Sequence, residues 1–158
     1  MYKTILVPHA GTAGGDIALD HAIFAAKSSS SDIVLLHVVE EIQYPPSFAL
    51  SSSEREKLFK DIRTANEEIK KEMISEMEKR MQICKENGVA ARIRVVIGSA
   101  SEEILQTIDK ENVDLVVMAK RRKIKGLKGL LTLGSVSRKI VESTTCPVLL
   151  LDIAKEDD

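Results

Sequence analysis

The side chains that could do chemistry in this sequence are few and scattered. The three histidines, His9, His21 and His37, do not cluster, and Cys84 and Cys146 lie far apart without a C-x-x-C spacing. This spacing predicts no metal centre, and both cysteines are interpreted as buried, reduced thiols. The sequence also lacks the phosphate-loop, dinucleotide-binding, nucleophile-elbow and zinc-protease motifs, so no catalytic residue is assigned.

One segment does concentrate charge. It carries six basic side chains and no acidic one: Lys120, Arg121, Arg122, Lys123, Lys125 and Lys128. Two interpretations stay open: a solvated loop, or a basic rim for a phosphate-bearing ligand, an acidic protein surface or nucleic acid. Gly134 and Ser135 follow at the start of an expected helix, whose N-terminus can attract one anionic group.

The elements that must position these residues alternate between strands and helices. Apolar runs predict strands at 4–7, 33–39, 92–97, 114–118 and 148–151, with 92–97 at an edge of the sheet. Helical spacing predicts four helices: one capped by Asp16, a long one over 58–84, a short one opened by a capping box at Ser99–Glu102, and a last one over 135–143. This order predicts a parallel sheet with helices on both faces and a ligand crevice beyond the carboxyl ends of the strands.

Composition limits the class of protein. The 158 residues fit a single domain, 1–158, with a mobile segment at 40–53 and a polar tail at 153–158. The net charge of -1 favours neither nucleic acid nor an anionic membrane, and the aromatic content of 3% provides no stacking surface. The first apolar run, 4–7, is too short for a signal peptide or a membrane span, so we expect a cytoplasmic protein.

From Tyr2–Pro8 to Cys146–Leu150 the chain resembles the universal stress protein family. Further segments match the family in order: Leu35–Val39, Gly98 with Glu102–Leu105, Asp114–Met118 and Leu133–Val136. Each is weak alone, but the ordered set is specific. The resemblance implies an α/β fold with a five-stranded parallel sheet in the order 3-2-1-4-5 and a reversal between the first and fourth strands. It also implies a homodimer through the C-terminal strand, at Val148, Leu149, Leu150 and Leu151.

The resemblance further implies a nucleotide site at the reversal. Nucleotide-binding members hold adenine near an Asp in the first loop and near the end of the second strand, which corresponds to Val38 here. Their phosphates rest on the pattern G-2x-G-9x-G-[ST], because residues without Cβ let amide groups approach phosphate oxygens. The site residues expected on this basis are Pro8, His9, Ala10, Gly11, Val38, Gly98, Ala119, Lys120, Arg121, Arg122, Gly134, Ser135 and Val136.

The sequence departs from this pattern at the positions that hold adenine and phosphate in the nucleotide-binding members. The Asp position is Ala10, and only the closing Gly134-Ser135 of the glycine pattern remains. The two leading glycines are replaced in either register, by Ala119 and Arg122 or by Arg121 and Ile124. Gly126 and Gly129 are interpreted as a flexible turn, because they stand close to Gly134 and away from the fourth strand.

Three hypotheses for function follow. The first is a non-catalytic, dimeric stress-response or regulatory module that has no assigned cofactor and binds ATP poorly or not at all. The second keeps ATP or AMP binding, with the basic loop replacing the glycines and supporting at most slow hydrolysis. The third is an adaptor for a polyanion or an acidic partner through the Lys120–Lys128 loop, with nucleic acid the least favoured ligand. The sequence identifies neither the physiological ligand nor the inducing stress.

Overall fold

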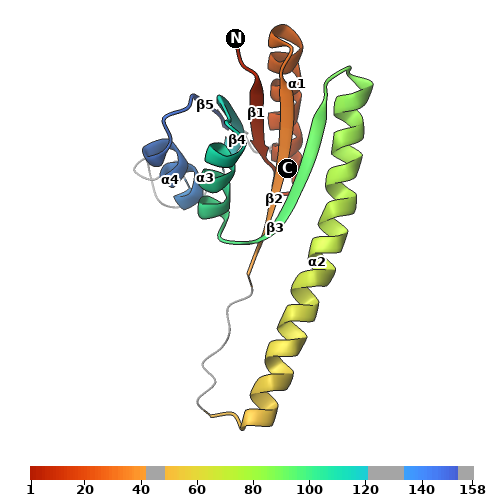
Figure 1. Ribbon diagram of the computed structural model, residues 1–158, viewed down its shortest axis with the longest axis vertical. Coiled ribbons are helices and arrows are strands. Elements are labelled where there is room, and N and C mark those ends of the chain that lie inside the picture. Colours follow the sequence, from red (N-terminus) through yellow and green to blue (C-terminus); the bar gives the residue numbers. More distant parts are fainter. Residues whose placement is uncertain (42–48, 121–133, 153–158) are drawn as a thin grey trace, which may run out of the picture.

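The computed structural model describes residues 1–41, 49–120 and 134–152, and strands alternate with helices throughout this part of the chain (Figure 1). The strands are β1 (Thr4–Pro8), β2 (Asp32–Glu40), β3 (Ala91–Gly98), β4 (Leu115–Lys120) and β5 (Val148–Asp152). The helices are α1 (Ala13–Ser29), α2 (Ser52–Glu86), α3 (Ala100–Lys110) and α4 (Ser135–Ser143). The segment 42–48, part of the expected mobile connection, and the tail 153–158 lie outside the described residues.

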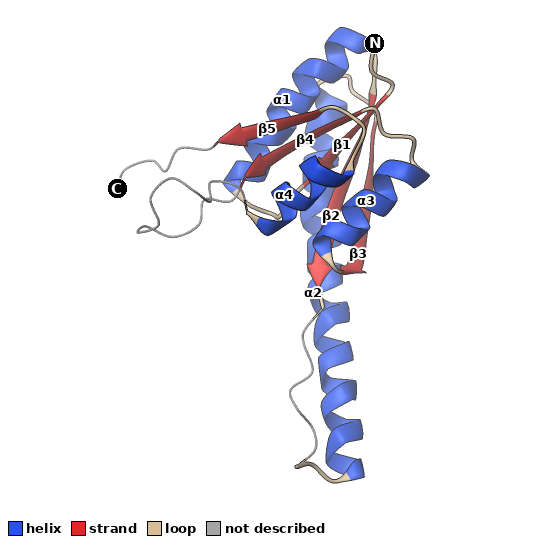
Figure 2. Cartoon of the chain, turned by 90° about the vertical axis from the view of Figure 1, so that its left-hand side faces the viewer, coloured by secondary structure: helices blue, strands red, loops and turns tan. Residues whose placement is uncertain are grey.

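The five strands form one parallel sheet in the order β3-β2-β1-β4-β5. This confirms the predicted order, the edge position of β3 and the reversal between β1 and β4. Helices cover both faces, with α3 and α4 on the side that Figure 2 turns toward the viewer and α1 and α2 behind the sheet. Because all strands run in the same direction, their carboxyl ends and the loops that follow them meet at one edge.

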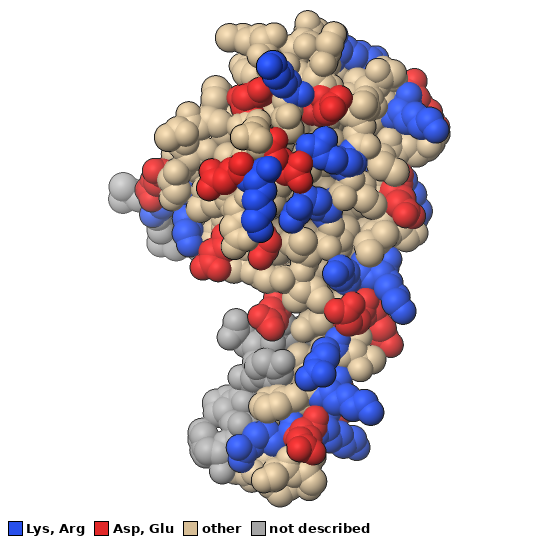
Figure 3. Space-filling view, viewed as in Figure 1, with Lys and Arg blue, Asp and Glu red and all other residues tan. Residues whose placement is uncertain are grey.

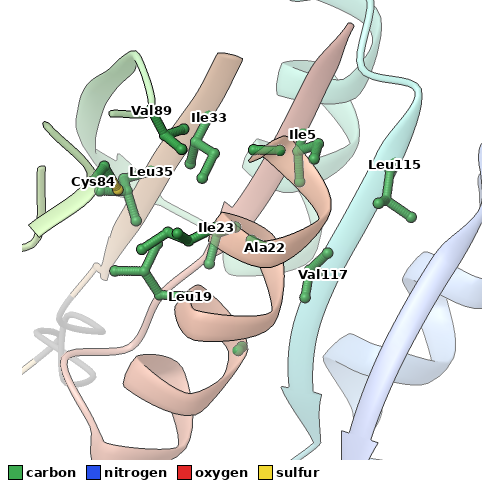
Figure 4. Packing of buried hydrophobic residues seen from close by; sticks show 13 residues of the cluster. Ile5, Leu19, Ala22, Ile23, Ile33, Leu35, Cys84, Val89, Leu115 and Val117 are labelled. Atoms are coloured by element: carbon green, nitrogen blue, oxygen red, sulfur yellow. The ribbon is translucent and has the colours of Figure 1, made fainter. Parts of the chain in front are cut away.

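An aliphatic core lies on each face of the sheet. On the α1 side, residues such as Ile5, Leu19, Ile33 and Val117 interlock with Cys84 of α2 (Figure 4). On the other side, the opposite-facing residues of the same strands pack against α3 and α4. Burial of one such side chain stabilises the fold by about 1.5–3 kcal/mol. Strands buried on both faces explain the nearly continuous apolar runs of the sequence.

Helix α2 extends well beyond the sheet (Figure 1). Its 35 residues span about 52 Å at 1.5 Å per residue, whereas the eight residues of β3 span about 26 Å. Met77 and Cys84 of its second half are fully buried. The helix begins with a capping box in which the Ser51 hydroxyl and the Glu54 side chain bond each other's backbone N–H groups.

Two predicted helix caps are wrong. Asp16 does not cap α1: the helix begins at Ala13, and the Thr12 hydroxyl accepts a hydrogen bond from the Gly15 N–H at 3.3 Å. Gly14 and Gly15 therefore lie in the first helical turn. Ser99 is the N-cap of α3, but its side chain makes no capping hydrogen bond, so the predicted capping box is absent.

Three further boundaries and burials differ from the prediction. Strand β4 continues to Lys120, beyond the predicted end at 118, because it pairs with β5 up to Asp152. Helix α2 already includes Ser52 and Ser53, which were assigned to the mobile segment. Both cysteines are free, but only Cys84 is fully buried, since Cys146 lies in the partly exposed turn before β5.

Candidate functional site

The crevice is set by the way β1 and β4 separate. The two strands pair at only two positions, Ile5 with Leu115 and Leu6 with Val116. Beyond these positions β1 follows β2, and the His9 N–H donates to the Leu36 carbonyl at 2.8 Å. Strand β4 instead follows β5. The main chains thus part at the strand-order reversal, where ligands bind in open α/β sheets.

Several expected site residues lie around this point. Pro8 ends β1, and Ala10 and Gly11 are exposed in the loop that leads to α1. Ala119 and Lys120 end β4 on the other side of the reversal. Arg121 and Arg122 lie outside the described residues.

Val38 and Gly98 lie farther out along the sheet. Val38 pairs with Val96 of β3 and packs toward the α3–α4 side. Gly98 ends the edge strand β3, where a Cβ would lie 3.0 Å from Glu103 Oε1. The strand order places both residues on the β1 side of the crevice.

Lys120 has an acidic partner that the sequence did not reveal. Its ammonium lies 3.0 Å from Asp152 Oδ2, and only 17% of its side chain is exposed. The two residues face each other because Lys120 and Asp152 are in register on β4 and β5. The first cation of the basic segment is therefore neutralised by an ion pair at the end of the sheet.

The N-terminus of α4 has the features of an anion site. Gly134 is its N-cap and has no side chain to bond the first amide groups, and the first turn, which includes Ser135 and Val136, contains no acidic residue. The first-turn N–H groups and the helix dipole favour a negative charge at this position.

His9 follows β1 directly, but its ring does not open to solvent. The side chain has no exposed surface. Its Nδ1 accepts a hydrogen bond from the Gly11 N–H at 3.0 Å, and its Nε2 lies 3.0 Å from Asp16 Oδ1. An acceptor at Nδ1 and a carboxylate beside Nε2 fix the neutral tautomer with its proton on Nε2.

Helix α2 completes this cluster. The Arg80 Nε–H donates to Asp16 Oδ1 at 2.8 Å, and the Arg80 Nη1 group bonds Glu76 Oε2 at 3.0 Å. The Arg80 Nε–H also points toward His9 Nε2 at 3.2 Å. Because the Gly11 N–H takes the single lone pair of the neutral ring at Nδ1, Nε2 carries the proton, and the Arg80 N–H makes its hydrogen bond with the closer Asp16 Oδ1. We call His9, Asp16, Arg80 and Glu76 the His9 cluster; it ties β1, α1 and α2 together beside the crevice loop.

The pKa values in the His9 cluster follow from burial and charge. Burial lowers the pKa of His9 below 6.5, and the positive charge of Arg80 adds to this effect. Burial opposes ionisation of Asp16, but the hydrogen bonds and charge of Arg80 still hold the pKa of Asp16 below its usual value. The cluster at neutral pH is thus a neutral imidazole beside an ionised Asp–Arg pair.

The glycines of this region fit the cluster. A Cβ on Gly15 would lie 2.7–2.9 Å from three atoms of the His9 ring, so the ring packs directly on the α1 main chain. Gly11 has a φ of +74°, which favours glycine. Four residues of this region were not predicted as site residues from the sequence: Gly15, Asp16, Arg80 and Glu76. One signal was present: Arg80 is a cation on the same helical face as Met77 and Cys84.

Comparison with known proteins agrees with this architecture. The family model described as "Universal stress protein family" matches residues 1–152. The chain belongs to the universal stress protein family. It is 32% identical over 151 residues to the universal stress protein YxiE of Bacillus subtilis, covering 96% of this chain and 99% of YxiE.

Solved structures share the fold of this universal stress protein. MJ0577 of Methanocaldococcus jannaschii is similar with a TM-score of 0.78 and 24% identity, and the match covers 99% of both chains. A universal stress protein in complex with cAMP has a TM-score of 0.64 and 19% identity, covering 96% of this chain and 97% of that one. A family protein from Arabidopsis thaliana with AMP bound has a TM-score of 0.60 and 21% identity, covering 98% and 94%. Within the described residues, no helix is long and apolar enough to cross a membrane.

Proposed function

We propose that this universal stress protein is a non-catalytic, cytoplasmic regulatory module whose crevice binds ATP poorly or not at all. The proposal rests on the arrangement of the residues at the end of β4. In one of the two registers of the family's phosphate pattern, Ala119 stands at the first glycine. Here Ala119 and Lys120 continue the strand in register with β5, and Lys120 is held by Asp152. Across the crevice, the exposed residue at the Asp position is Ala10, which offers no carboxylate to an adenosine group.

Titration calorimetry with Mg²⁺-ATP tests this proposal. We expect no saturable heat at ATP concentrations up to about 1 mM, which corresponds to a binding free energy weaker than about -4 kcal/mol. We also expect no phosphate release above a sample without protein. Stoichiometric binding in the low micromolar range would contradict the proposal.

A second candidate function keeps a nucleotide or another phosphate ligand. It is supported by the uncapped N-terminus of α4 and by the relatives whose structures contain cAMP or AMP. Ser135→Asp places a negative charge at this N-terminus, and Ser143→Asp, at the last residue of the same helix, is the matched control. If α4 holds a phosphate group, only Ser135→Asp will abolish AMP binding. Equal binding by both variants would place the ligand elsewhere.

We further propose a homodimer through β5. This edge strand pairs with β4 on one side only, and the side chain of Leu149 is 40% exposed although it lies in an apolar strand. Leu149→Glu is expected to yield monomers in light scattering after size exclusion. Val141→Glu changes a similarly exposed residue on α4 and is expected to leave the dimer intact. A Leu149→Glu variant that stays dimeric would exclude β5 as the interface.

The adaptor hypothesis receives less support. Acidic and basic side chains are interspersed over the face that Figure 3 shows, without an area of one sign among the described residues. Lys120 is also neutralised by Asp152. The other five cations of the Lys120–Lys128 segment lie outside the described residues, so the hypothesis keeps its place behind the other two.

A further inference from the structure

The hydrogen bond between the Gly11 amide and His9 makes the crevice loop depend on the protonation state of one ring. A backbone N–H can only donate, so the bond requires a lone pair on His9 Nδ1. A proton that arrives from solvent at Nδ1 converts this atom into a donor. Two donors then face each other, and the Gly11 bond is lost, while Nε2–H continues to donate to Asp16.

The ring cannot avoid this conflict by moving. It is fully buried, and it packs so closely on α1 that a Cβ at Gly15 would lie within 2.9 Å of three ring atoms. Its main chain is fixed as well, because the His9 carbonyl accepts a hydrogen bond from His37 Nδ1 at 2.7 Å. The exposed Ala10 and Gly11 have more freedom than the ring, so the loop is the part that moves.

Charged groups from three elements surround the ring. Asp16 on α1 favours the protonated ring, whereas Arg80 on α2 and the neighbouring His37 on β2 disfavour it. Glu76 on α2 forms an ion pair with Arg80. Together with burial, these groups keep the ring neutral at neutral pH and move its protonation to more acidic pH.

We propose that His9 is an acid-sensitive latch for the crevice loop at residues 10–12. The neutral ring holds the loop closed against β1 through Gly11, and protonation of Nδ1 releases it. That the released loop borders a ligand site rests on the proposed function, whereas the latch itself is a property of the free protein.

NMR titration of the full chain tests the latch without any ligand. Long-range nitrogen–proton spectra report the tautomer and the protonation of each histidine, and the amide spectrum reports the Gly11 N–H, from about pH 8 down to about pH 4. We expect the Nε2–H tautomer at His9 at neutral pH, and a His9 titration with a midpoint below 6.5. The Gly11 amide signal should shift with the same midpoint.

Two variants sharpen the test. Arg80→Gln removes the cation that disfavours protonation, so the His9 and Gly11 midpoints should rise together. His21→Gln removes an exposed histidine on α1 and should leave both midpoints unchanged.

Three results would overturn the latch: a His9 ring that carries its proton on Nδ1 at neutral pH, a Gly11 amide that does not follow His9, or a His9 that stays neutral until the protein unfolds. Calorimetry at neutral pH tests the proposed function separately. Failure of one proposal is therefore distinguishable from failure of the other.

Discussion

Gly15→Ala is the substitution that most directly probes the packing of His9 on α1. The added Cβ would lie 2.7, 2.8 and 2.9 Å from three atoms of the imidazole, far inside ordinary van der Waals contact at about 3.5–4.0 Å. The ring is fixed by Gly11 and Asp16, so the strain falls on the main chain of α1 or on these hydrogen bonds.

The magnitude is the balance of two effects. Overpacking in a buried site costs about 1–3 kcal/mol, and alanine in place of glycine favours a helix by up to about 1 kcal/mol. We expect the free energy of unfolding to fall by up to about 2 kcal/mol, measured by urea denaturation followed by circular dichroism.

A double-mutant cycle isolates the contact. In a His9→Ala background the ring is absent, so Gly15→Ala should be neutral or stabilising. The two substitutions are then coupled by about 1–3 kcal/mol. If Gly15→Ala were stabilising in the native background, or had the same effect in both backgrounds, the proposed ring–helix contact would be refuted.

Three further outcomes are expected. The pKa of His9 is lowered on folding, so the unfolded chain binds more protons than the folded chain below pH 6.5. The free energy of unfolding should therefore fall as the pH drops from 6.5 toward the pKa of His9 in the folded protein. Urea denaturation curves at a series of pH values should show a smaller fall for His9→Gln than for the native protein. Burial raises the pKa of the Cys84 thiol to about 11, so mass spectrometry after alkylation at mildly basic pH should find Cys146 modified first and Cys84 modified only on unfolding; rapid native labelling of Cys84 would contradict its burial. Ser51→Ala removes the N-cap of α2, so the amides of the first turn should exchange faster while the rest of the protein keeps its protection.

The strands were predictable because each one is indicated by the residues of its own short segment. A strand such as 33–39, covered on both faces, needs apolar residues at nearly every position, and this leaves a clear pattern in the sequence. The long helix α2 was equally clear, since Met77 and Cys84 recur at helical spacing on its buried face. These elements and the family resemblance were sufficient for the fold and for the point of strand-order reversal.

The chemistry beside the crevice was not predictable, because its causes are distant in the sequence. Gly15 lies inside α1, where the His9 ring that follows β1 leaves no room for a Cβ. Arg80 and Asp16 are 64 positions apart. Only the packing of α2 beside α1 brings them together.

The overhang of α2 also bears on how this protein can change during evolution. Its second half supplies the core residues and Arg80, so the register between helix and sheet is fixed there. Insertions or deletions nearer Ser52 leave that register untouched; they move Ile62 and Asn66, the buried residues of the first half, and alter how far the helix reaches. Because 3.6 residues make one turn, changes of about seven residues would keep the outer half facing the same way. Homologues should therefore vary in arm length in steps of about two turns.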